Sequence, residues 1–281
     1  MTARSDWTAY APLDAGPVEQ LRAAVGDVRE GFSRHRGWRY LAGETVKNSY
    51  RRTVLGPWWL TAQQAVYVGG LAFVFSQLFH QDLKTFLPYV ATGFLVYILL
   101  IGLLRNGANV FLQQASALKS TRQPLTGFVL RTVMVELIQF AHNAVISLVF
   151  FATGYLHLGV WVLLAPVALL VILVNGVLLG LWLGPVVARF RDVGPAIDSV
   201  LQVIIFFTPI FYATSDLSGA RATLIHLNPF TPFIEFFRTP LLGHAPDLAT
   251  VVGVCGYTLL DLVLALVVFS RTRSRLPYWV S

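Results

Sequence analysis

The sequence predicts an all-α, polytopic membrane protein with six membrane-spanning helices, and three observations lead to this prediction. Of the 281 residues, 56% are hydrophobic and only 12% are charged, whereas about 25% of a soluble domain is charged. The mean hydropathy is positive, at +0.64. The apolar residues form continuous runs, whereas the strands of a membrane barrel would alternate over about 10 residues. These properties argue against a soluble globular enzyme.

The N-terminal part divides into two segments before the first apolar run. Residues 1–16 show no periodicity, and we expect them to be disordered. In residues 17–56, four apolar residues recur at spacings of four, three and four, which is one helical face: Leu21, Val25, Val28 and Phe32. Basic and aromatic residues follow. The segment is therefore predicted to form an amphipathic helix in the cytoplasmic headgroup layer, with a plain basic anchor as the alternative.

Residues 57–281 form the predicted membrane domain. A helix needs about 20 mostly apolar residues to cross a bilayer, and the fifth of six candidate runs is short and broken by Pro209. No secretory signal peptide precedes the first run, so we expect it to remain in the mature protein. The predicted spans are Trp58–Phe79, Phe86–Leu104, Phe128–Gly154, Val160–Ala188, Ile197–Tyr212 and Leu248–Ser270.

The connection between spans five and six, residues 213–247, is too apolar for a solvated loop. Asn228–Pro229 is typical of a helix start, with Asn as the cap and Pro in the first turn. Aromatic residues follow at helical spacing. The sequence therefore predicts a semi-buried helix, Pro229–Arg238, that lines or closes a pathway. An interfacial helix resting on lipid is the alternative.

The basic residues predict the orientation of the chain. Six spans place 18 of the 21 Lys and Arg residues on the side of the two termini. Basic residues concentrate on the cytoplasmic side of membrane proteins, so both termini are predicted to be cytoplasmic. The net charge of +7 is thus a topology signal, and we do not expect nucleic acid to be a partner.

Polar and small residues inside the spans have two interpretations. Span three carries Glu136, Gln139, His142 and Asn143. A charged residue in the membrane is expected to face protein or water, so these residues form either a polar seam between helices or a proton relay. Span four carries three glycines four residues apart, which permits close helix packing: Gly176, Gly180 and Gly184.

The sequence offers no catalytic or metal site. Its only cysteine is Cys255, and it lacks the Cys/His spacing of a zinc site. It contains no GxxxxGK loop for nucleotide phosphates either. We therefore expect a non-catalytic chain with no metal and no cofactor of its own.

Several motifs, in order, resemble those of one transporter family. Residues 48–59 (Asn-Ser-Tyr-Arg-Arg-Thr-Val-Leu-Gly-Pro-Trp-Trp) are similar to the segment that leads into the first span of ABC-transporter permeases for bacterial polysaccharides. Residues 79–89 resemble the first external loop of that family, and residues 188–193 (Ala-Arg-Phe-Arg-Asp-Val) its turn after span four. Thr208-Pro-Ile, Leu227-Asn-Pro-Phe and the C-terminal Arg275-Leu-Pro-Tyr-Trp-Val also fit. The resemblance covers about residues 38–281, although residues 41–47 and Lys119–Leu125 match only loosely.

The resemblance implies a function in the cytoplasmic (inner) membrane. Two copies of the permease would form the channel, and two copies of a separate ATPase would bind ATP and Mg²⁺ and dock below. The exported substrate would be an O-antigen, teichoic acid, capsule or galactan type of glycan on an undecaprenyl-type lipid. The implied docking and coupling residues are Glu44, Ser116, Lys119, Arg122, Arg189, Arg191 and Asp192.

Aromatic residues are the implied channel and interface residues, because aromatic rings can stack on the apolar faces of sugars. The candidates for the channel or gate are Tyr67, Phe206, Phe207, Phe211, Tyr212, Phe230, Phe233 and Phe237. The candidates for the aromatic belt at the membrane interface are Trp38, Trp58 and Trp59.

Three other functions remain open at this point. An ABC permease for small drugs or lipids is a related alternative. A membrane-embedded glycosyl- or phosphotransferase would need an acidic metal-binding cluster, but Asp192 and Asp198 stand alone. A proton-coupled secondary transporter would be expected to carry internal repeats, and none is visible.

Overall fold

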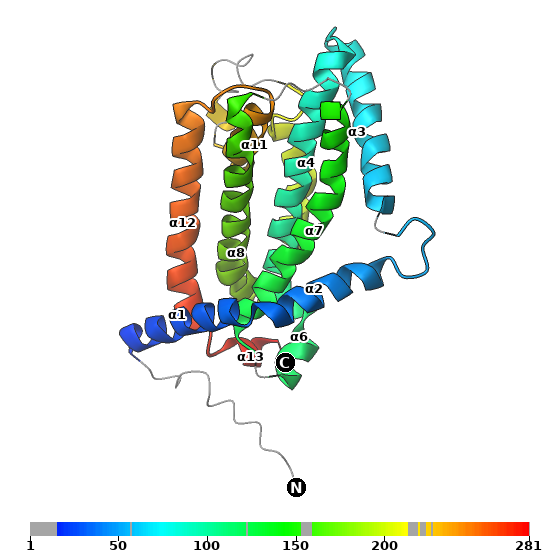
Figure 1. Ribbon diagram of the computed structural model, residues 1–281. Helices are drawn as coiled ribbons and strands as arrows, with labels where there is room; N and C mark the ends of the chain where they lie inside the picture. Colours follow the sequence, from blue (N-terminus) through cyan, green and yellow to red (C-terminus); the bar gives the residue numbers. More distant parts are fainter. Residues whose placement is uncertain are drawn as a thin grey trace.

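The computed structural model describes most of the chain as a bundle of helices (Figure 1). Within the described residues every regular element is a helix and no strand occurs, as predicted. The segment predicted to be disordered lies, except for Gly16, outside the described residues. The structure describes residues 16–56, 58–121, 123–152, 159–212, 219, 223–225 and 227–280, with the side chains of Leu60 and of residues 150–152 left out.

In the part of the chain that the structure describes, four helices are long and apolar enough to cross a membrane. They correspond to the predicted spans two, three, four and six, and a short 3₁₀ turn, η2 (Val160–Leu164), leads into the third of them. They are α4 (Leu83–Ala108), α7 (Leu125–Ala152), α8 (Ala165–Arg189) and α12 (Leu248–Thr272).

The two other predicted spans differ from these four. Helix α3 (Trp58–Leu78) has 21 residues, but Gln63, Gln64 and Gln77 make it less apolar. The fifth is shorter, because α9 (Val193–Ile204) passes into the 3₁₀ turn η3 (Ile205–Phe207) and ends just before Pro209. The count of six spans therefore stays a prediction.

The N-terminal helices lie across one end of the bundle (Figure 1). They are α1 (Pro17–Ser33) and α2 (His35–Ser49), and the short helices α5 (Val110–Gln113), α6 (Ala115–Ser120) and α13 (Leu276–Trp279) belong to the same end. We call it the α1 end. The two termini of the described chain thus share one side, as an even number of crossings requires.

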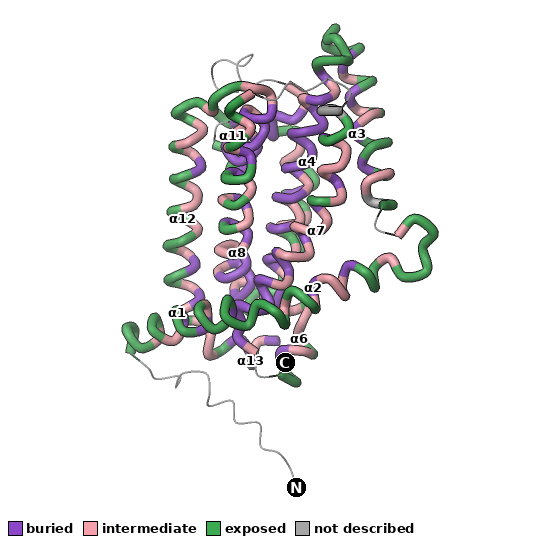
Figure 2. Tube along the Cα trace, in the orientation of Figure 1, coloured by how far each residue is buried: buried purple, intermediate pink, exposed green. Residues whose placement is uncertain are grey.

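The apolar face predicted for the first helix exists, but most of it does not pack on the bundle. Leu21, Val25 and Phe32 are exposed, and only Val28 of the four is partly buried against the core. Helix α1 packs mainly through Ala24, Asp27 and Gly31. Figure 2 shows the outer side of α1 as exposed. An outward apolar face on a helix lying across the end of a membrane bundle is typical of an interfacial helix.

At the opposite end, the predicted semi-buried helix is α11 (Phe230–Leu241) (Figure 1). We call this the α11 end. The structure confirms the burial, because α11 packs among α4, α8 and α12 with most of its side chains inaccessible. The helix begins one residue after the predicted Pro229 and ends at Leu241, beyond the predicted Arg238. Asn228 does contribute to its start, because its side chain accepts a hydrogen bond of 3.0 Å from the N–H of Phe230.

The three glycines of α8 lie at close helix contacts, which confirms the packing prediction. A Cβ on Gly176 would lie 2.6 Å from a methyl of Leu103 on α4, and one on Gly180 would lie 2.6 Å from a methyl of Val129 on α7. Real Cβ atoms do not approach other atoms so closely. Only residues without a side chain let α4, α7 and α8 meet in this way.

Candidate functional site

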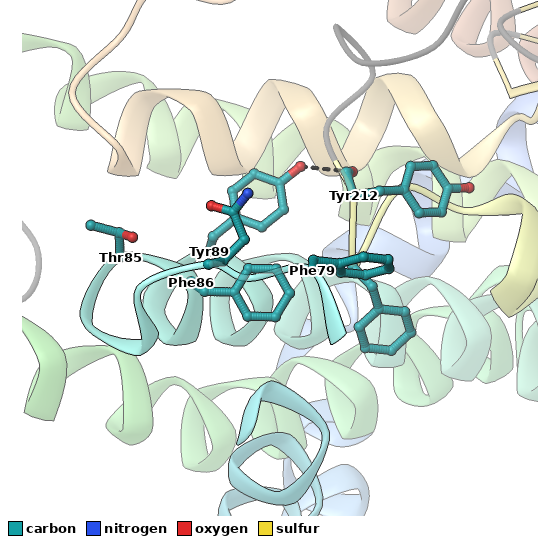
Figure 3. Close-up of a pocket in the computed structure, with 7 residues that line it drawn as sticks. Phe79, Thr85, Phe86, Tyr89 and Tyr212 are labelled. Carbon is teal, nitrogen blue, oxygen red and sulfur yellow. Dashed lines mark hydrogen bonds between the residues drawn. The ribbon is translucent and has the colours of Figure 1, made fainter. Parts of the chain in front are cut away.

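The α11 end contains an aromatic pocket of about 530 Å³ (Figure 3). It lies where the end of α3, the connection to α4, the first turns of α4 and the chain after η3 meet. Its walls combine aromatic rings with hydroxyl and amide groups. They are Phe79, Gln81, Thr85, Phe86, Tyr89, Phe211 and Tyr212.

Contacts between neighbouring elements hold the walls of this pocket. The Tyr89 hydroxyl donates a 2.9 Å hydrogen bond to the backbone oxygen of Tyr212, drawn as a dashed line in Figure 3. The Phe211 ring stacks on that of Phe75 with 4.7 Å between centroids. Offset-stacked rings are a favourable arrangement. The pocket therefore presents fixed ring faces beside hydrogen-bonding groups, the combination that suits a sugar ring.

Arg238 anchors α11 beside this pocket. The side chain is fully buried, and its guanidinium lies 3.9 Å from the centroid of the Tyr89 ring. Its Nη1 donates a 2.9 Å hydrogen bond to the oxygen of Pro209, and its Nη2 pairs with Glu235 on the same helix. Arg238 thus joins α11 to α4 and to the break that ends the fifth predicted span.

The charge pattern of the sequence predicts that Arg238 is one of three basic residues on the external side, with Lys84 and Arg221 as the others. Arg238 and Lys84 do lie at the α11 end, and Arg221 falls outside the described residues. Complete burial of Arg238 was not foreseen. The sequence contains a signal for it, because Glu235 stands three residues earlier on the same helix and can neutralise the charge.

The predicted channel residues fall into three groups. Phe211 and Tyr212 line the aromatic pocket. Tyr67 on α3 and Phe206 and Phe207 in η3 are exposed, Phe206 to 76%. The three predicted phenylalanines of α11 are instead buried. The Phe230 ring meets Tyr97 and the Phe237 ring meets Phe140, both edge to face, and Phe233 is buried as well. A channel role for any of them stays a prediction.

The predicted interfacial aromatics lie towards the α1 end. The Trp38 indole donates a 3.0 Å hydrogen bond to the oxygen of Gly31, which fixes α2 against the end of α1. Trp58 and Trp59, at the start of α3, are exposed. The Trp58 ring also meets the His142 ring edge to face, at 5.8 Å between centroids.

The polar residues of α7 form helix-to-helix contacts. Glu136 is buried and accepts a 2.7 Å hydrogen bond from the Asn106 amide of α4. His142 contacts its own helix, with 2.8 Å between Nδ1 and the oxygen of Ile138, while Asn143 is buried and Gln139 half-buried. The partner of Glu136 is therefore a neutral amide on the neighbouring helix. This arrangement favours the polar seam over the proton relay.

The predicted docking residues gather at the α1 end. Ser116 and Lys119 are exposed on α6, and Arg189, Arg191 and Asp192 are exposed at the turn between α8 and α9. Glu44 pairs with Lys47 at 3.0 Å, and this hydrogen bond raises the pKa of Lys47. Arg122 lies outside the described residues. No contact with another protein tests these roles, so docking stays a prediction.

Two residues that connect the N-terminal helix to the bundle were missed from the sequence. Asp27 of α1 is 2% exposed and accepts hydrogen bonds from the backbone N–H groups of Leu125 and Thr126, at 3.1 and 2.9 Å. It thus satisfies unpaired donors at the start of α7. Its other partner is Arg273, just after α12. In the sequence, only the small residues Ala24 and Gly31, on the same helix face as Asp27, indicated that this face packs against the bundle.

Comparison with known proteins adds two findings to this geometry. The model of the ABC-2 type transporter family matches residues 36–242, more than half of the chain. The O-antigen export system permease protein RfbA of Myxococcus xanthus is 23% identical over 237 residues, which cover 83% of this chain and 91% of that protein. In the residues that the structure describes, no group of acidic, His or Cys side chains could hold a metal ion.

Proposed function

Because the chain belongs to the ABC-2 type transporter family, we propose that it is the membrane subunit of an exporter that carries a lipid-linked polysaccharide across the cytoplasmic membrane. The observation that carries the proposal is the likeness to an O-antigen export permease over 83% of this chain and 91% of that protein.

The aromatic pocket supports a glycan as the substrate. A sugar has an apolar ring face and a rim of hydroxyl groups. The pocket offers rings for the face and the Tyr89, Tyr212, Thr85 and Gln81 polar groups for the rim. We propose that it receives sugar units as the polymer leaves the α11 end, which would be the external side.

The α1 end supports docking of a separate ATPase. The sequence holds no phosphate-binding loop, so energy from ATP and its Mg²⁺ would enter through another chain. Exposed charged groups from α2, α6 and the α8–α9 turn stand together there. We propose that two ATPase copies dock on this surface, which would be cytoplasmic. Two copies of the permease would enclose the channel.

Exposed apolar side chains support a pairing of two copies. Val66, Tyr67, Phe73 and Val74 are all exposed on α3, which stands at the edge of the bundle (Figure 1). In the assembled exporter, α3 and the exposed aromatics of η3 would face the second copy and the channel. Lipid would cover the other apolar surfaces.

Export assays in a strain lacking this chain test the proposal. We expect the lipid-linked glycan to accumulate on the inner side, and the wild-type chain to restore export. Phe211→Ala and Tyr212→Ala should restore it poorly, while Trp161→Ala, an exposed aromatic outside the pocket, should restore it fully. Lost drug efflux with unchanged glycan export would instead indicate a drug or lipid permease.

Purification of the chain tests whether a separate subunit hydrolyses ATP. The chain alone should hydrolyse no ATP, and it should co-purify with a nucleotide-binding subunit. Hydrolysis by the purified chain without that subunit would refute the proposal.

A further inference from the structure

Arg131 is a half-buried cation whose recorded partners are both neutral. It lies in the second turn of α7, and its Nη2 donates a 2.8 Å hydrogen bond to the Thr45 hydroxyl of α2. Its Nη1 donates a 3.1 Å bond to the Gln114 amide oxygen. A guanidinium carries five N–H donors, so donors remain. Among the described residues, the ion pairs of the structure do not include Arg131.

Two recesses meet at Arg131 and Thr45. The outer one, of about 510 Å³, lies between α2 and α7. The inner one, of about 290 Å³, continues toward Glu136. Since a water molecule takes about 30 Å³ of liquid volume, either recess can hold a group as large as a phosphate. We call the outer one the α2–α7 recess, and its walls are Leu41, Glu44, Thr45, Asn48, Ser49 and Arg131.

The charge around the α2–α7 recess favours an anion. The carboxylate of Glu44 is already paired with Lys47, and that of Glu136 accepts a hydrogen bond from Asn106. Arg51 and Arg52 are exposed in the turn that directly follows α2. Arg131 therefore has no ion-pair partner among the described residues, and these two further cations follow the wall residue Ser49 in the chain. Glu136, whose partner is a neutral amide, lines only the inner recess.

The position of the recess indicates the kind of anion. It opens between a helix lying across the end of the bundle and the first turns of a spanning helix (Figure 1). In a membrane this is the depth of the lipid headgroups. Arginine binds phosphate through two parallel charge-assisted hydrogen bonds, a geometry that lysine does not offer.

We propose that the α2–α7 recess binds the phosphate group of a membrane lipid. Arg131 supplies the charge and the forked donors, and the Asn48 amide completes the shell. The phosphate belongs either to a bulk phospholipid or to the diphosphate of a polyprenyl carrier. This inference rests on the membrane location of the chain and not on the proposed export of a glycan.

Lipid binding to the full chain in maltoside micelles, which contain no phosphate, tests the proposal. Native mass spectrometry would measure binding of phosphatidylglycerol, of a polyprenyl diphosphate, of polyprenol as the tail alone, and of inorganic phosphate as the unanchored group. We expect Arg131→Gln to bind at least one of the two phosphate lipids about tenfold more weakly. Arg131→Lys should recover only part of this loss. Polyprenol binding should not change.

Arg105→Gln is the matched control, because Arg105 lies at the same end but has Asp198 as its partner at 2.6 Å. It should bind like the wild type. Asn48 is exposed, so Asn48→Ala should fold even if Arg131→Gln does not, and it should bind the phosphate lipid about fivefold more weakly.

The outcomes separate the sources. Loss for both lipids supports a general headgroup site, and loss for the polyprenyl diphosphate alone supports a carrier site. Equal binding of the phosphate lipids by the wild type, Arg131→Gln and Asn48→Ala would overturn the proposal. The proposal would also be overturned if Arg131→Gln weakened the binding of polyprenol as much as that of the phosphate lipids. The same holds if the wild type bound inorganic phosphate alone in a way that depends on Arg131.

Discussion

Asp27 and Arg273 stand 246 residues apart in the sequence and form an ion pair, with 3.1 Å between Nε and Oδ2. Asp27 belongs to the first helix and Arg273 follows the last long one. The carboxylate of Asp27 also caps the start of α7 and accepts a 2.7 Å hydrogen bond from the Thr126 hydroxyl. One buried side chain therefore fastens α1 to two elements of the bundle.

We expect Asp27→Ala to lower the stability of the protein by about 3 kcal/mol, because it removes a buried carboxylate together with its hydrogen bonds to the start of α7 and its ion pair with Arg273. Thermal unfolding in nanodiscs would measure this. Glu30→Gln is the control. It removes an exposed pair with Arg34, the residue that directly follows α1, and such pairs contribute about 0.5 kcal/mol. Similar unfolding temperatures for the two variants would argue against the role of Asp27.

Gly180→Ala is expected to destabilise the bundle by about 1–3 kcal/mol, because the added methyl overlaps Val129 and the helices cannot separate freely. Gly256 on α12 has no atom within 4 Å of an added Cβ. Gly256→Ala should therefore be neutral or stabilise by up to about 1 kcal/mol through its helix propensity. Unfolding curves of the two variants test this contrast. We expect a lower free energy of unfolding for Gly180→Ala and an unchanged or higher one for Gly256→Ala.

Glu136→Gln should preserve transport to within about threefold, since the amide oxygen of Gln can still accept the hydrogen bond from Asn106. Glu136→Leu leaves the buried Asn106 amide without that acceptor, and we expect it to destabilise by about 1–3 kcal/mol. Transport by the wild type and by Glu136→Gln, measured over a range of pH, distinguishes the polar seam from the proton relay. Abolished transport in Glu136→Gln, with a folded protein, would revive the proton relay.

Tyr89→Phe removes the hydroxyl that holds Tyr212 but keeps the ring beneath Arg238. Its expected cost is about 1 kcal/mol. Tyr89→Leu also removes the cation–π contact, which is worth about 2 kcal/mol when desolvated. Hydrogen exchange of α11 provides the measurement. Equal protection of α11 in Tyr89→Phe and Tyr89→Leu would show that the ring does not anchor Arg238.

The membrane character, the long apolar helices and the buried external helix could all be predicted from the sequence. Each follows from a local property: an apolar run sets α4, α7, α8 and α12, and an Asn–Pro start followed by spaced aromatics sets α11. The glycine spacing of α8 is a local signal of the same kind. The count of six spans could not be settled, because α3 and α9 are less apolar or shorter than the others.

The site was less predictable, because its chemistry depends on contacts between distant segments. The sequence indicated Phe211 and Tyr212 as lining residues but not the walls they share with Phe79 and Thr85. It treated Arg131 and Arg238 only as charges that report orientation. Their partners, Thr45 and Gln114 for one and Tyr89 and Pro209 for the other, come from other elements.

The sequence by itself determined four segments that are long and apolar enough to cross a membrane, and it determined which face of α1 is apolar. Hydropathy and helical period are properties of neighbouring residues. Only the tertiary structure decided which polar groups are buried and what satisfies them. A carboxylate such as Asp27 is stable inside the protein only where a helix start and a guanidinium meet it, and folding alone brings Leu125, Thr126 and Arg273 to that point.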